Sequence, residues 1–425
     1  MKLRIEKAIY GGAGLARADG KAIFVPFTLP DEVVEAHITE DHASYASAEL
    51  DSVLEASPTR VSPPCSYFGE CGGCHYQHSS YAQQVEMKAQ ILRETLERAH
   101  LKEIPAITVA QGESLGYRNR IRLHVDRASS MLCYKRRGSH ANLPVNECPI
   151  AAPVLEDALK ASLLRGKEWR LGECFEEIEF FTNAEQSSIL LSLWSCRGPK
   201  AAKEDFQRLW PQLVASIPQI GGGAVFSSER GKKTGKVLAL AGEQALTYKA
   251  AGHDYRLSLG SFFQVNRFLI DALVELVVGG HTGALAWDLY AGVGLFAHAL
   301  ASRFEQVVAV ESAAGSVRGL RRNLTGGLHR IVASTTLDFL RRVGRQPRPD
   351  LVVVDPPRAG LGKDVTTLLE EIRPQHITYV SCDPATLSRD LKSLLDSGYH
   401  LKNMYMVDLF PQTFHLESVA ILSLS

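Results

Sequence analysis

The chain has 425 residues and carries equal numbers of basic and acidic side chains, 47 of each. At about 100 to 200 residues per domain, this length predicts two or three domains with hydrophobic cores. A content of 45% hydrophobic and 22% charged residues excludes a disordered chain and a uniformly basic nucleic-acid-binding protein. No apolar stretch reaches the roughly 18 residues of a membrane helix, and the first residues lack the apolar core of a signal peptide, so we expect a cytoplasmic protein without a membrane anchor.

The balanced total hides a basic middle section. Residues 59–250 carry 25 basic and 20 acidic side chains, whereas residues 1–58 carry 5 and 10. The segment from Arg118 to Arg137 holds seven basic residues and a single acid, Asp126. Such a patch is typical of a surface that binds a polyanion, although arginines on solvated strand and helix faces give the same pattern.

The first 57 residues contain short β-rich runs separated by glycine and proline, which predicts a small five-stranded barrel over residues 1–57. Through GGAGLAR, the run IFVPFTLPDE and the strand that follows, this stretch resembles a TRAM domain, an OB-like barrel attached to RNA-modifying enzymes. The barrel is acidic, so RNA would have to meet a local face of it, or the barrel serves mainly to position other parts.

Residues 58–250 show a mixed pattern that predicts a central α+β domain. The apolar spacing in YAQQVEMKAQILRETLERAH, residues 81–100, predicts a helix. Strand-like runs are RNRIRLHV, IEFFTN and SSILLSLW, and AAKEDFQRLWPQLVASI is helical in pattern. The glycines Gly221–Gly223 are expected to interrupt the regular structure.

From Leu257 onward, short apolar runs alternate with helical segments, which predicts an α/β domain with a parallel sheet over residues 251–425. The seven runs are ALAWDLY, QVVAVE, RIVAS, LVVVD, HITYVS, LKNMYMVDLF and SVAILSL. The last two have only a short connection and are expected to form an antiparallel hairpin. That hairpin is typical of Rossmann-like methyltransferases, as opposed to dinucleotide dehydrogenases.

A glycine loop follows the first of these strands. In Asp288–Phe296, DLYAGVGLF, the glycines Gly292 and Gly294 allow a ligand close to the backbone at the carboxyl end of the strand. About 20 residues later, Glu311 ends the next strand, where a carboxylate can accept hydrogen bonds from ribose hydroxyls. Because the loop lacks the third glycine of a dinucleotide fingerprint, S-adenosylmethionine fits better than a dinucleotide.

A second motif, DPPR, begins at Asp355 after the buried strand LVVVD. Its prolines hold an extended backbone, and Asp355 is expected to face the cofactor or the target base. Methyltransferases that act on exocyclic amino groups usually carry an aromatic residue after such prolines. Arg358 stands there instead, which disfavours that chemistry.

Two further residues form a candidate catalytic pair. Cys382 follows the strand HITYVS and lies just before a helix, whose amino end favours a thiolate. Methylation of pyrimidine C5 needs a nucleophile that adds to C6 and a base that later removes the C5 proton. Cys382 can be the nucleophile, and Glu417, at the start of the last strand, can be the base. Alternatively, Cys382 is a packing residue, Glu417 a solvated carboxylate and His415 a structural hydrogen-bonding group.

Together these motifs resemble the uracil-5-methyltransferase family that acts on RNA. They occur in the family's order as SFFQVN, DLYAGVGLF, VVVDPPRAG, YVSCDPATLSRDL and HLES. The resemblance implies that Cys382 is the nucleophile and Glu417 the base. It also implies that S-adenosylmethionine is contacted by Gln264, Tyr290, Glu311 and Asp355, with Asp338 near the adenine. Leu295 stands where some members carry an asparagine that touches the cofactor. Asn266 and Arg358 are expected to help form the site.

Four cysteines have a spacing that suggests a metal site. Cys65, Cys71 and Cys74 are followed much later by Cys148, and four thiolates can hold zinc or an iron-sulfur cluster. The spacing resembles the 4Fe-4S site of the subgroup of uracil methyltransferases that carries the TRAM module, and zinc stays the alternative. The expected role of the cluster is structural: it would tie this segment to the basic section and shape an RNA surface.

The predicted fold class is therefore α/β: a Rossmann-like S-adenosylmethionine-dependent methyltransferase domain, preceded by an OB-like TRAM barrel and a central α+β iron-sulfur domain. The predicted function is methylation of uridine C5 in RNA by a monomer. Resemblance alone favours 23S rRNA over tRNA as the substrate. An inactive RNA-binding or redox-sensing protein is the alternative from another class.

Overall fold

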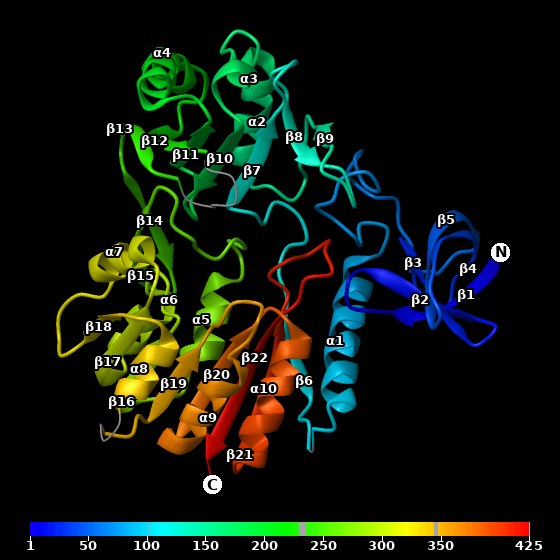
Figure 1. Ribbon diagram of the computed structural model, residues 1–425, viewed down its shortest axis with the longest axis vertical. Coiled ribbons are helices and arrows are strands. Elements are labelled where there is room, and N and C mark those ends of the chain that lie inside the picture. The colour runs from blue at the N-terminus through cyan, green and yellow to red at the C-terminus, as the bar shows by residue number, and fades with distance from the viewer. Residues whose placement is uncertain (102, 229–234, 344–346, 425) are drawn as a thin grey trace.

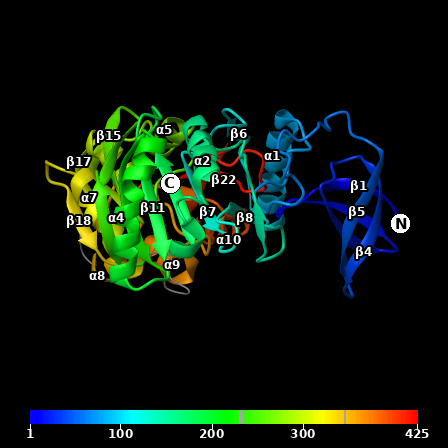
Figure 2. The ribbon, with the colours of Figure 1, turned by 90° about the horizontal axis from the view of Figure 1, so that it is seen from above.

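The computed structural model describes residues 1–101, 103–228, 235–343 and 347–424. These residues form a β-barrel, a mixed α/β domain and a larger α/β domain that ends the chain (Figure 1). Figure 2 shows the barrel at one end of the molecule, next to the long helix α1. None of the helices in the described residues is long and apolar enough to cross a membrane.

The barrel is closed, with strand order β1-β2-β3-β5-β4. Its strands are β1 (Lys2–Ala8), β2 (Ala13–Ala18), β3 (Lys21–Pro26), β4 (Val33–Asp41) and β5 (Tyr45–Glu55). Alternating residues such as Leu3, Ile5, Val25 and Val34 fill its interior, as the two-residue period of a strand requires. The predicted five-stranded barrel is confirmed.

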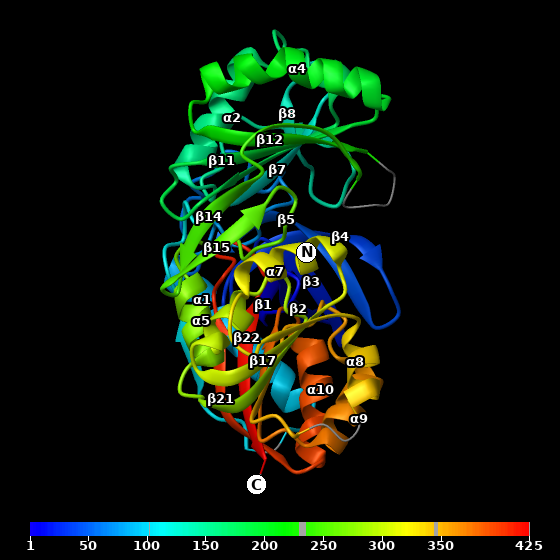
Figure 3. The ribbon, with the colours of Figure 1, turned by 90° about the vertical axis from the view of Figure 1, so that its left-hand side faces the viewer.

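The central domain has a seven-stranded sheet with order β13-β12-β11-β10-β7-β8-β9, and helix α4 lies across its top in Figure 3. The strands are β7 (Arg120–Val125), β8 (Leu132–Lys135), β9 (Asn142–Pro144), β10 (Glu177–Thr182), β11 (Ile189–Ser195), β12 (Ile220–Ser227) and β13 (Val237–Gly242). The helices are α2 (Pro153–Arg165), α3 (Leu171–Cys174) and α4 (Pro199–Ser216). Trp169, Phe180, Leu191 and Phe206 are among the side chains of its core.

The expected break at Gly221–Gly223 is wrong, because these glycines lie inside strand β12. A Cβ atom on Gly222 would lie 1.7 Å from the carbonyl oxygen of Glu243, and one on Gly223 would lie 2.6 Å from the Trp210 ring. Glycine is therefore needed at these positions because neighbouring groups lie too close to the strand for a side chain. A two-stranded hairpin, β14 (Ala245–Ala250) and β15 (His253–Ser258), leads to the last domain, and the predicted boundary at 250/251 falls within it.

The C-terminal domain has an eight-stranded sheet with order β18-β17-β16-β19-β20-β22-β21-β6. Seven of its strands are β16 (Gly283–Leu289), β17 (Phe304–Glu311), β18 (Arg330–Ala333), β19 (Leu351–Val354), β20 (His376–Ser381), β21 (Tyr399–Val407) and β22 (Glu417–Leu424). These are the seven predicted runs, and β22 is antiparallel to both of its neighbours, as the predicted hairpin requires.

Helices cover both faces of this sheet. They are α5 (Ile270–Val278), α6 (Leu295–Ala301), α7 (Ala314–Asn323), α8 (Thr336–Val343), α9 (Gly362–Ile372) and α10 (Pro384–Asp396). Alternate residues of the buried strand β19 belong to two different cores: Val353 packs with α5 and α6, and Val352 packs with α8, α9 and α10. This doubly covered sheet is the reason why its strands are continuous apolar runs.

Two elements from the predicted central region pack against the C-terminal sheet instead. Helix α1 (Tyr81–Arg98) begins at Ser80, whose hydroxyl accepts from the Gln83 amide, and it buries Leu92 and Leu96 in the same core as α10. Strand β6 (Ile107–Ala110) extends the sheet by pairing in parallel with β21. The chain thus visits the C-terminal domain before it enters the central one.

Helix α1 fixes the loop between β21 and β22, residues 408–416, which we call the anchored loop. The Lys88 ammonium lies 2.6 Å from a carboxylate oxygen of Asp408 and donates to the Phe410 carbonyl at 2.9 Å, and both ion-pair partners are buried. The Gln84 side chain donates to the side-chain oxygen of Gln412 and accepts from the backbone amide of Gln412, at 2.9 Å each. Because Glu417 follows directly, these contacts also determine where the candidate base lies.

We predict that Lys88→Met lowers the free energy of unfolding by about 3 to 5 kcal/mol, because it leaves the Asp408 carboxylate buried without its cationic partner. Urea unfolding followed by circular dichroism measures this change. The matched control Lys363→Met, at an exposed position of α9, should change stability by less than about 0.5 kcal/mol. A double substitution of Lys88 and Asp408 by apolar residues should recover most of the loss; no recovery would contradict the ion-pair explanation.

Candidate active site

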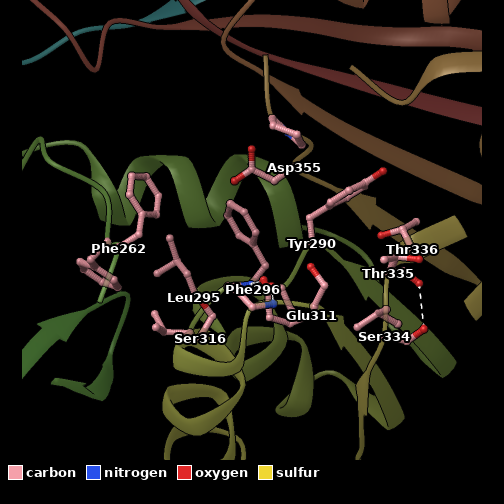
Figure 4. Close-up of a pocket in the computed structure, with 18 of the residues that line it drawn as sticks. Phe262, Tyr290, Leu295, Phe296, Glu311, Ser316, Ser334, Thr335, Thr336 and Asp355 are labelled. Carbon is pink, nitrogen blue, oxygen red and sulfur yellow. Dashed lines mark hydrogen bonds between the residues drawn. The ribbon is translucent and has the colours of Figure 1, made fainter. Parts of the chain in front are cut away.

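A cavity of about 500 Å³ lies at the carboxyl ends of strands β16, β17 and β19. Figure 4 shows side chains from several segments around it, among them Tyr290, Glu311 and Asp355. Gln264, the fourth residue expected to contact the cofactor, also lines this cavity. The structure therefore brings together four of the five predicted cofactor residues.

The glycine loop shapes one wall of this cavity. Tyr290, Gly292 and Gly294 have φ angles of 72°, 56° and 95°, in the left-handed region that is unfavourable for a tyrosine. The Glu311 carboxylate accepts hydrogen bonds from the amides of Gly292 at 2.9 Å and Ala313 at 2.6 Å. Glu311 is thus held at the cavity edge by two backbone amides, with its carboxylate available to a polar ligand.

Asp338 does not line this cavity, in contrast to the prediction. Its carboxylate accepts a hydrogen bond from the Thr335 hydroxyl at 2.8 Å, and its amide donates to the same hydroxyl at 3.1 Å. The cavity is lined there by Ser334, Thr335 and Thr336, which the sequence analysis did not single out. Their position directly after strand β18 was the available signal. Leu295 also lines the cavity, so an apolar group takes the place of the amide that some family members carry.

We expect Glu311→Gln to raise the dissociation constant for S-adenosylmethionine by about 10-fold or more, because a hydrogen bond to a charged group contributes about 1.5 to 3 kcal/mol. Isothermal titration calorimetry on the RNA-free protein gives this constant. Glu305→Gln is the matched control, since Glu305 is exposed on the same strand, β17. Equal affinities of the two variants would show that Glu311 does not bind the ligand.

The candidate nucleophile and base lie opposite each other at the edge of the sheet. Ser381, the last residue of β20, pairs with Ser418 of the antiparallel strand β22. This register places Cys382 across from Glu417. Asp383 caps helix α10 by accepting from the amides of Ala385 at 3.1 Å and Thr386 at 2.9 Å. The sequence-distant pair is therefore assembled by strand pairing.

The environment of Cys382 does not favour the thiolate in the way that its helix position predicts. Burial and the neighbouring Glu417 carboxylate raise the pKa of the Cys382 thiol to about 11, while Arg358 lowers it. The amino end of α10 is thus outweighed by burial and by nearby acids. Before substrate binds, the cysteine is a protonated thiol at neutral pH.

Two carboxyl groups at this edge influence each other. Burial raises the pKa of Glu417 well above its usual value, and Asp355 raises it further. Burial also raises the pKa of Asp355 to about 7. Asp355 lines the cofactor cavity and acts electrostatically on Cys382, so the cavity and the catalytic pair adjoin each other.

Two predicted site formers have distinct roles. A guanidinium nitrogen of Arg358 lies 3.3 Å from Nδ1 of His415, and the pKa of His415 is lowered to about 4 by burial and by Arg358. Asn266 is fully buried and donates to the Leu409 carbonyl at 3.2 Å. Arg358 therefore places a positive charge beside Cys382, the candidate nucleophile, whereas Asn266 helps to hold the anchored loop.

The chain is similar to known RNA methyltransferases over nearly its full length. An uncharacterized RNA methyltransferase of Streptomyces avermitilis is 33% identical over 446 residues, with 99% of this chain and 97% of that protein covered. The 23S rRNA (uracil(1939)-C(5))-methyltransferase RlmD of Vibrio parahaemolyticus is 30% identical, with coverage of 99% and 95%. A sequence model of the tRNA (Uracil-5-)-methyltransferase family matches residues 347–424, and the TRAM domain matches residues 1–50. The chain belongs to the RNA uracil-5-methyltransferase family.

A solved structure supports the fold of this uracil-5-methyltransferase. The crystal structure of Pyrococcus abyssi tRNA (uracil-54, C5)-methyltransferase in complex with S-adenosyl-L-homocysteine superposes with a TM-score of 0.78 at 24% sequence identity. The match covers 99% of this chain and 100% of that one. The barrel, central domain and C-terminal domain therefore share one overall fold with that enzyme.

The four predicted metal-ligating cysteines of this methyltransferase line one cavity of about 300 Å³: Cys65, Cys71, Cys74 and Cys148. Burial raises the pKa of each thiol, and their mutual influence adds to it for Cys65, Cys71 and Cys74. Among the described residues, no group of three or more histidine, cysteine or acidic side chains is placed to hold a metal ion.

The basic section from Arg118 to Arg137 is largely paired within the chain. Arg122 forms an ion pair with Glu177 and lies over the Trp194 ring, 3.8 Å from its centroid. Arg136 pairs with Glu70, and Arg137 lies 4.7 Å from the centroid of the Phe27 ring in the barrel. The excess charge available to an RNA is therefore smaller than the count of seven basic residues indicates.

We predict that alkylation of Cys382 by iodoacetamide, in the protein without cofactor or RNA, accelerates about tenfold per pH unit between pH 7 and 9. The thiolate is the reactive form, and below a pKa of about 11 its fraction rises tenfold per unit. Peptide mass spectrometry measures the rate, and Cys382→Ala identifies the signal. Glu417→Gln should increase the rate at pH 7.5, because it removes a negative charge beside the thiol. A rate that is independent of pH in this window would contradict the raised pKa.

Proposed function

We propose that this enzyme uses S-adenosylmethionine to methylate C5 of a uridine in structured RNA, with Cys382 as nucleophile and Glu417 as base. The observation that carries the proposal is the pairing of β20 with β22, which sets these two side chains opposite each other beside the cavity lined by Asp355. The proposed contacts of the cofactor are Gln264, Tyr290 and Glu311, which line the same cavity. Thr335 lines the part of the cavity where Asp338 was predicted.

The proposed reaction begins when the Cys382 thiol releases its proton to water and the resulting thiolate adds to C6 of the uracil ring. The C5–C6 π electrons move onto the C4 carbonyl, which makes C5 nucleophilic as part of an enolate. S-adenosylmethionine, held in the cavity lined by Tyr290, Glu311 and Asp355, would supply the methyl group that C5 accepts, and S-adenosylhomocysteine would be the product released. Glu417 then removes the proton from C5, the C5–C6 double bond re-forms, and the Cys382 thiolate is expelled. Arg358 stabilises the thiolate by its positive charge.

The proposed substrate is 23S rRNA, with tRNA as the second candidate. The rRNA preference is supported by the full-length similarity to the enzyme named RlmD, at 30% identity. The tRNA candidate is supported by the shared fold with the Pyrococcus abyssi enzyme. A uridine inside a stack cannot reach Cys382, so an exposed loop is the expected target, where unstacking costs least.

We further propose that the four cysteines hold a 4Fe-4S cluster with a structural role. Cys65, Cys71, Cys74 and Cys148 present four sulfurs to one cavity, which fits a four-thiolate ligand set. Zinc bound by the same four thiolates is the alternative, because cysteine thiolates also bind zinc in structural sites. An iron and sulfide assay on anaerobically purified protein distinguishes the two.

We predict that Cys382→Ala abolishes methylation and covalent adducts with RNA but still binds S-adenosylmethionine. Glu417→Gln should accumulate a covalent adduct that resists denaturation, because the C5 proton cannot leave and the thiolate is not expelled. Nucleoside mass spectrometry on unmodified 23S rRNA and tRNA detects 5-methyluridine, and a denaturing gel detects the adduct.

The matched control is Cys196→Ala, which removes an exposed thiol of the central domain and should leave activity unchanged. Retained turnover in Cys382→Ala would exclude the nucleophile. If the wild-type protein is folded and binds S-adenosylmethionine but transfers no label to either RNA, the inactive RNA-binding or redox-sensing alternative is favoured.

A further inference from the structure

The turn between β1 and β2 docks the barrel onto the catalytic half of the molecule. Gly12, at a φ of 94°, packs beneath His75, and a Cβ atom at this position would lie 3.2 Å from the His75 side chain. Ala8 and Leu29 of the barrel share a small core with Tyr76, in the segment before α1, and with Met87 and Ile91 of α1. The barrel is therefore held by apolar packing at a defined place.

Tyr10, in the same turn, reaches both segments that carry the catalytic pair. Its hydroxyl donates a hydrogen bond to the carbonyl oxygen of Cys382 at 3.3 Å. Its ring lies edge-on to Phe414 of the anchored loop, with centroids 5.5 Å apart and an interplanar angle of 88°. Phe414 in turn packs against His415, with centroids 4.3 Å apart. One barrel residue thus contacts the nucleophile's own peptide group and the loop that leads to the base.

The charges around Tyr10 are those of the active site. Burial raises the pKa of Tyr10 to about 12; Asp383, Cys382 and Glu417 also raise it, and Arg358 lowers it. The phenol therefore stays protonated at neutral pH and keeps its role as a donor to the Cys382 carbonyl.

We infer that Tyr10 is a positioning residue for the nucleophile, through which the barrel completes the catalytic cleft. The inference rests on the proposed function of Cys382. Attack on C6 requires the sulfur to lie about 3 to 3.5 Å from the carbon in the correct direction. The Tyr10 hydroxyl fixes the peptide group from which the Cys382 side chain projects, and the ring packs on the anchored loop that ends at Glu417. The structure thereby gives the acidic barrel a task that requires no RNA contact.

The test compares Tyr10→Phe, which keeps the ring and removes the hydroxyl, with Tyr45→Phe, a matched change at a half-exposed tyrosine of β5. The probe is a 23S rRNA or tRNA transcript, whichever the wild-type enzyme methylates, and a second transcript with 5-fluorouridine. Because fluorine at C5 cannot leave as a proton would, the Cys382 adduct persists and its rate of formation can be followed on denaturing gels.

Tyr10→Phe should lower kcat and the rate of adduct formation about 3- to 10-fold, as expected for the loss of one neutral hydrogen bond. KM for RNA, the affinity for S-adenosylmethionine and the unfolding temperature should match those of the wild type. Tyr10→Ala should lower the adduct rate further, because the packing on Phe414 is lost as well. Tyr45→Phe should behave like the wild type in all five measurements.

Two results would overturn the inference. An adduct rate in Tyr10→Phe equal to that of the wild type would show that the hydroxyl does not position Cys382. A defect confined to KM for RNA would make Tyr10 an RNA contact instead. A failure of the proposed function gives a different result: the wild-type enzyme then forms neither 5-methyluridine nor an adduct, and Cys382→Ala behaves like the wild type. That result would exclude both the proposed function and the positioning role of Tyr10.

Discussion

The buried ion pair between Lys88 and Asp408 is the contact on which the geometry of the candidate catalytic site depends. Two charges removed from water are stable only when they are paired and further hydrogen-bonded, and here both partners are almost fully inaccessible. Lys88 lies on α1 and Asp408 is the first residue of the anchored loop, so the ion pair fixes the position of the loop relative to the helix. Around it, Gln84 and Gln412 exchange neutral hydrogen bonds, and the Tyr117 hydroxyl donates to the Pro411 carbonyl at 3.0 Å. These contacts hold the anchored loop in the arrangement that sets Glu417 across from Cys382.

Electrostatics then limits how the catalytic pair can share charge. A Cys382 thiolate and a Glu417 carboxylate are like charges at neighbouring positions, and each is disfavoured by burial. The site therefore favours one negative charge at a time over two, with Arg358 as the nearby cation. The proposed reaction has the same requirement, because the thiolate is needed for attack and the carboxylate only after methyl transfer. Burial raises the pKa of Asp288, which precedes the glycine loop, to about 8 as well, so this carboxyl group is also largely neutral at physiological pH.

The features that local sequence determines were predicted well, and those that depend on distant packing were not. Motifs at strand ends led to four residues that line one cavity and to Cys382 and Glu417 at the paired ends of β20 and β22, because the order of strand, turn and helix fixes where such residues lie. Strand β6 escaped prediction because its four residues join the sheet only through pairing with β21, about 300 residues later in the chain. Gly222 was misjudged because its need for space comes from Glu243, in another segment. The direction of the Cys382 pKa shift was also wrong, since burial and Glu417 are tertiary effects that outweigh a local helix end.

The role inferred for Tyr10 has the same origin, because no motif joins two residues that lie 372 positions apart. A positioning role is also consistent with the acidic charge of the barrel. An RNA-binding module would be expected to be basic, yet residues 1–58 are acidic and the following section is basic. Two barrel side chains contact other parts of the chain: Lys7 pairs with Glu94 of α1 at 2.5 Å, and Phe27 lies under Arg137. An acidic barrel against a basic section is electrostatically complementary, which favours docking within the chain. A barrel whose main contacts are intramolecular can hold an active site in shape without binding RNA, and the turn that carries Tyr10 is where it reaches that site.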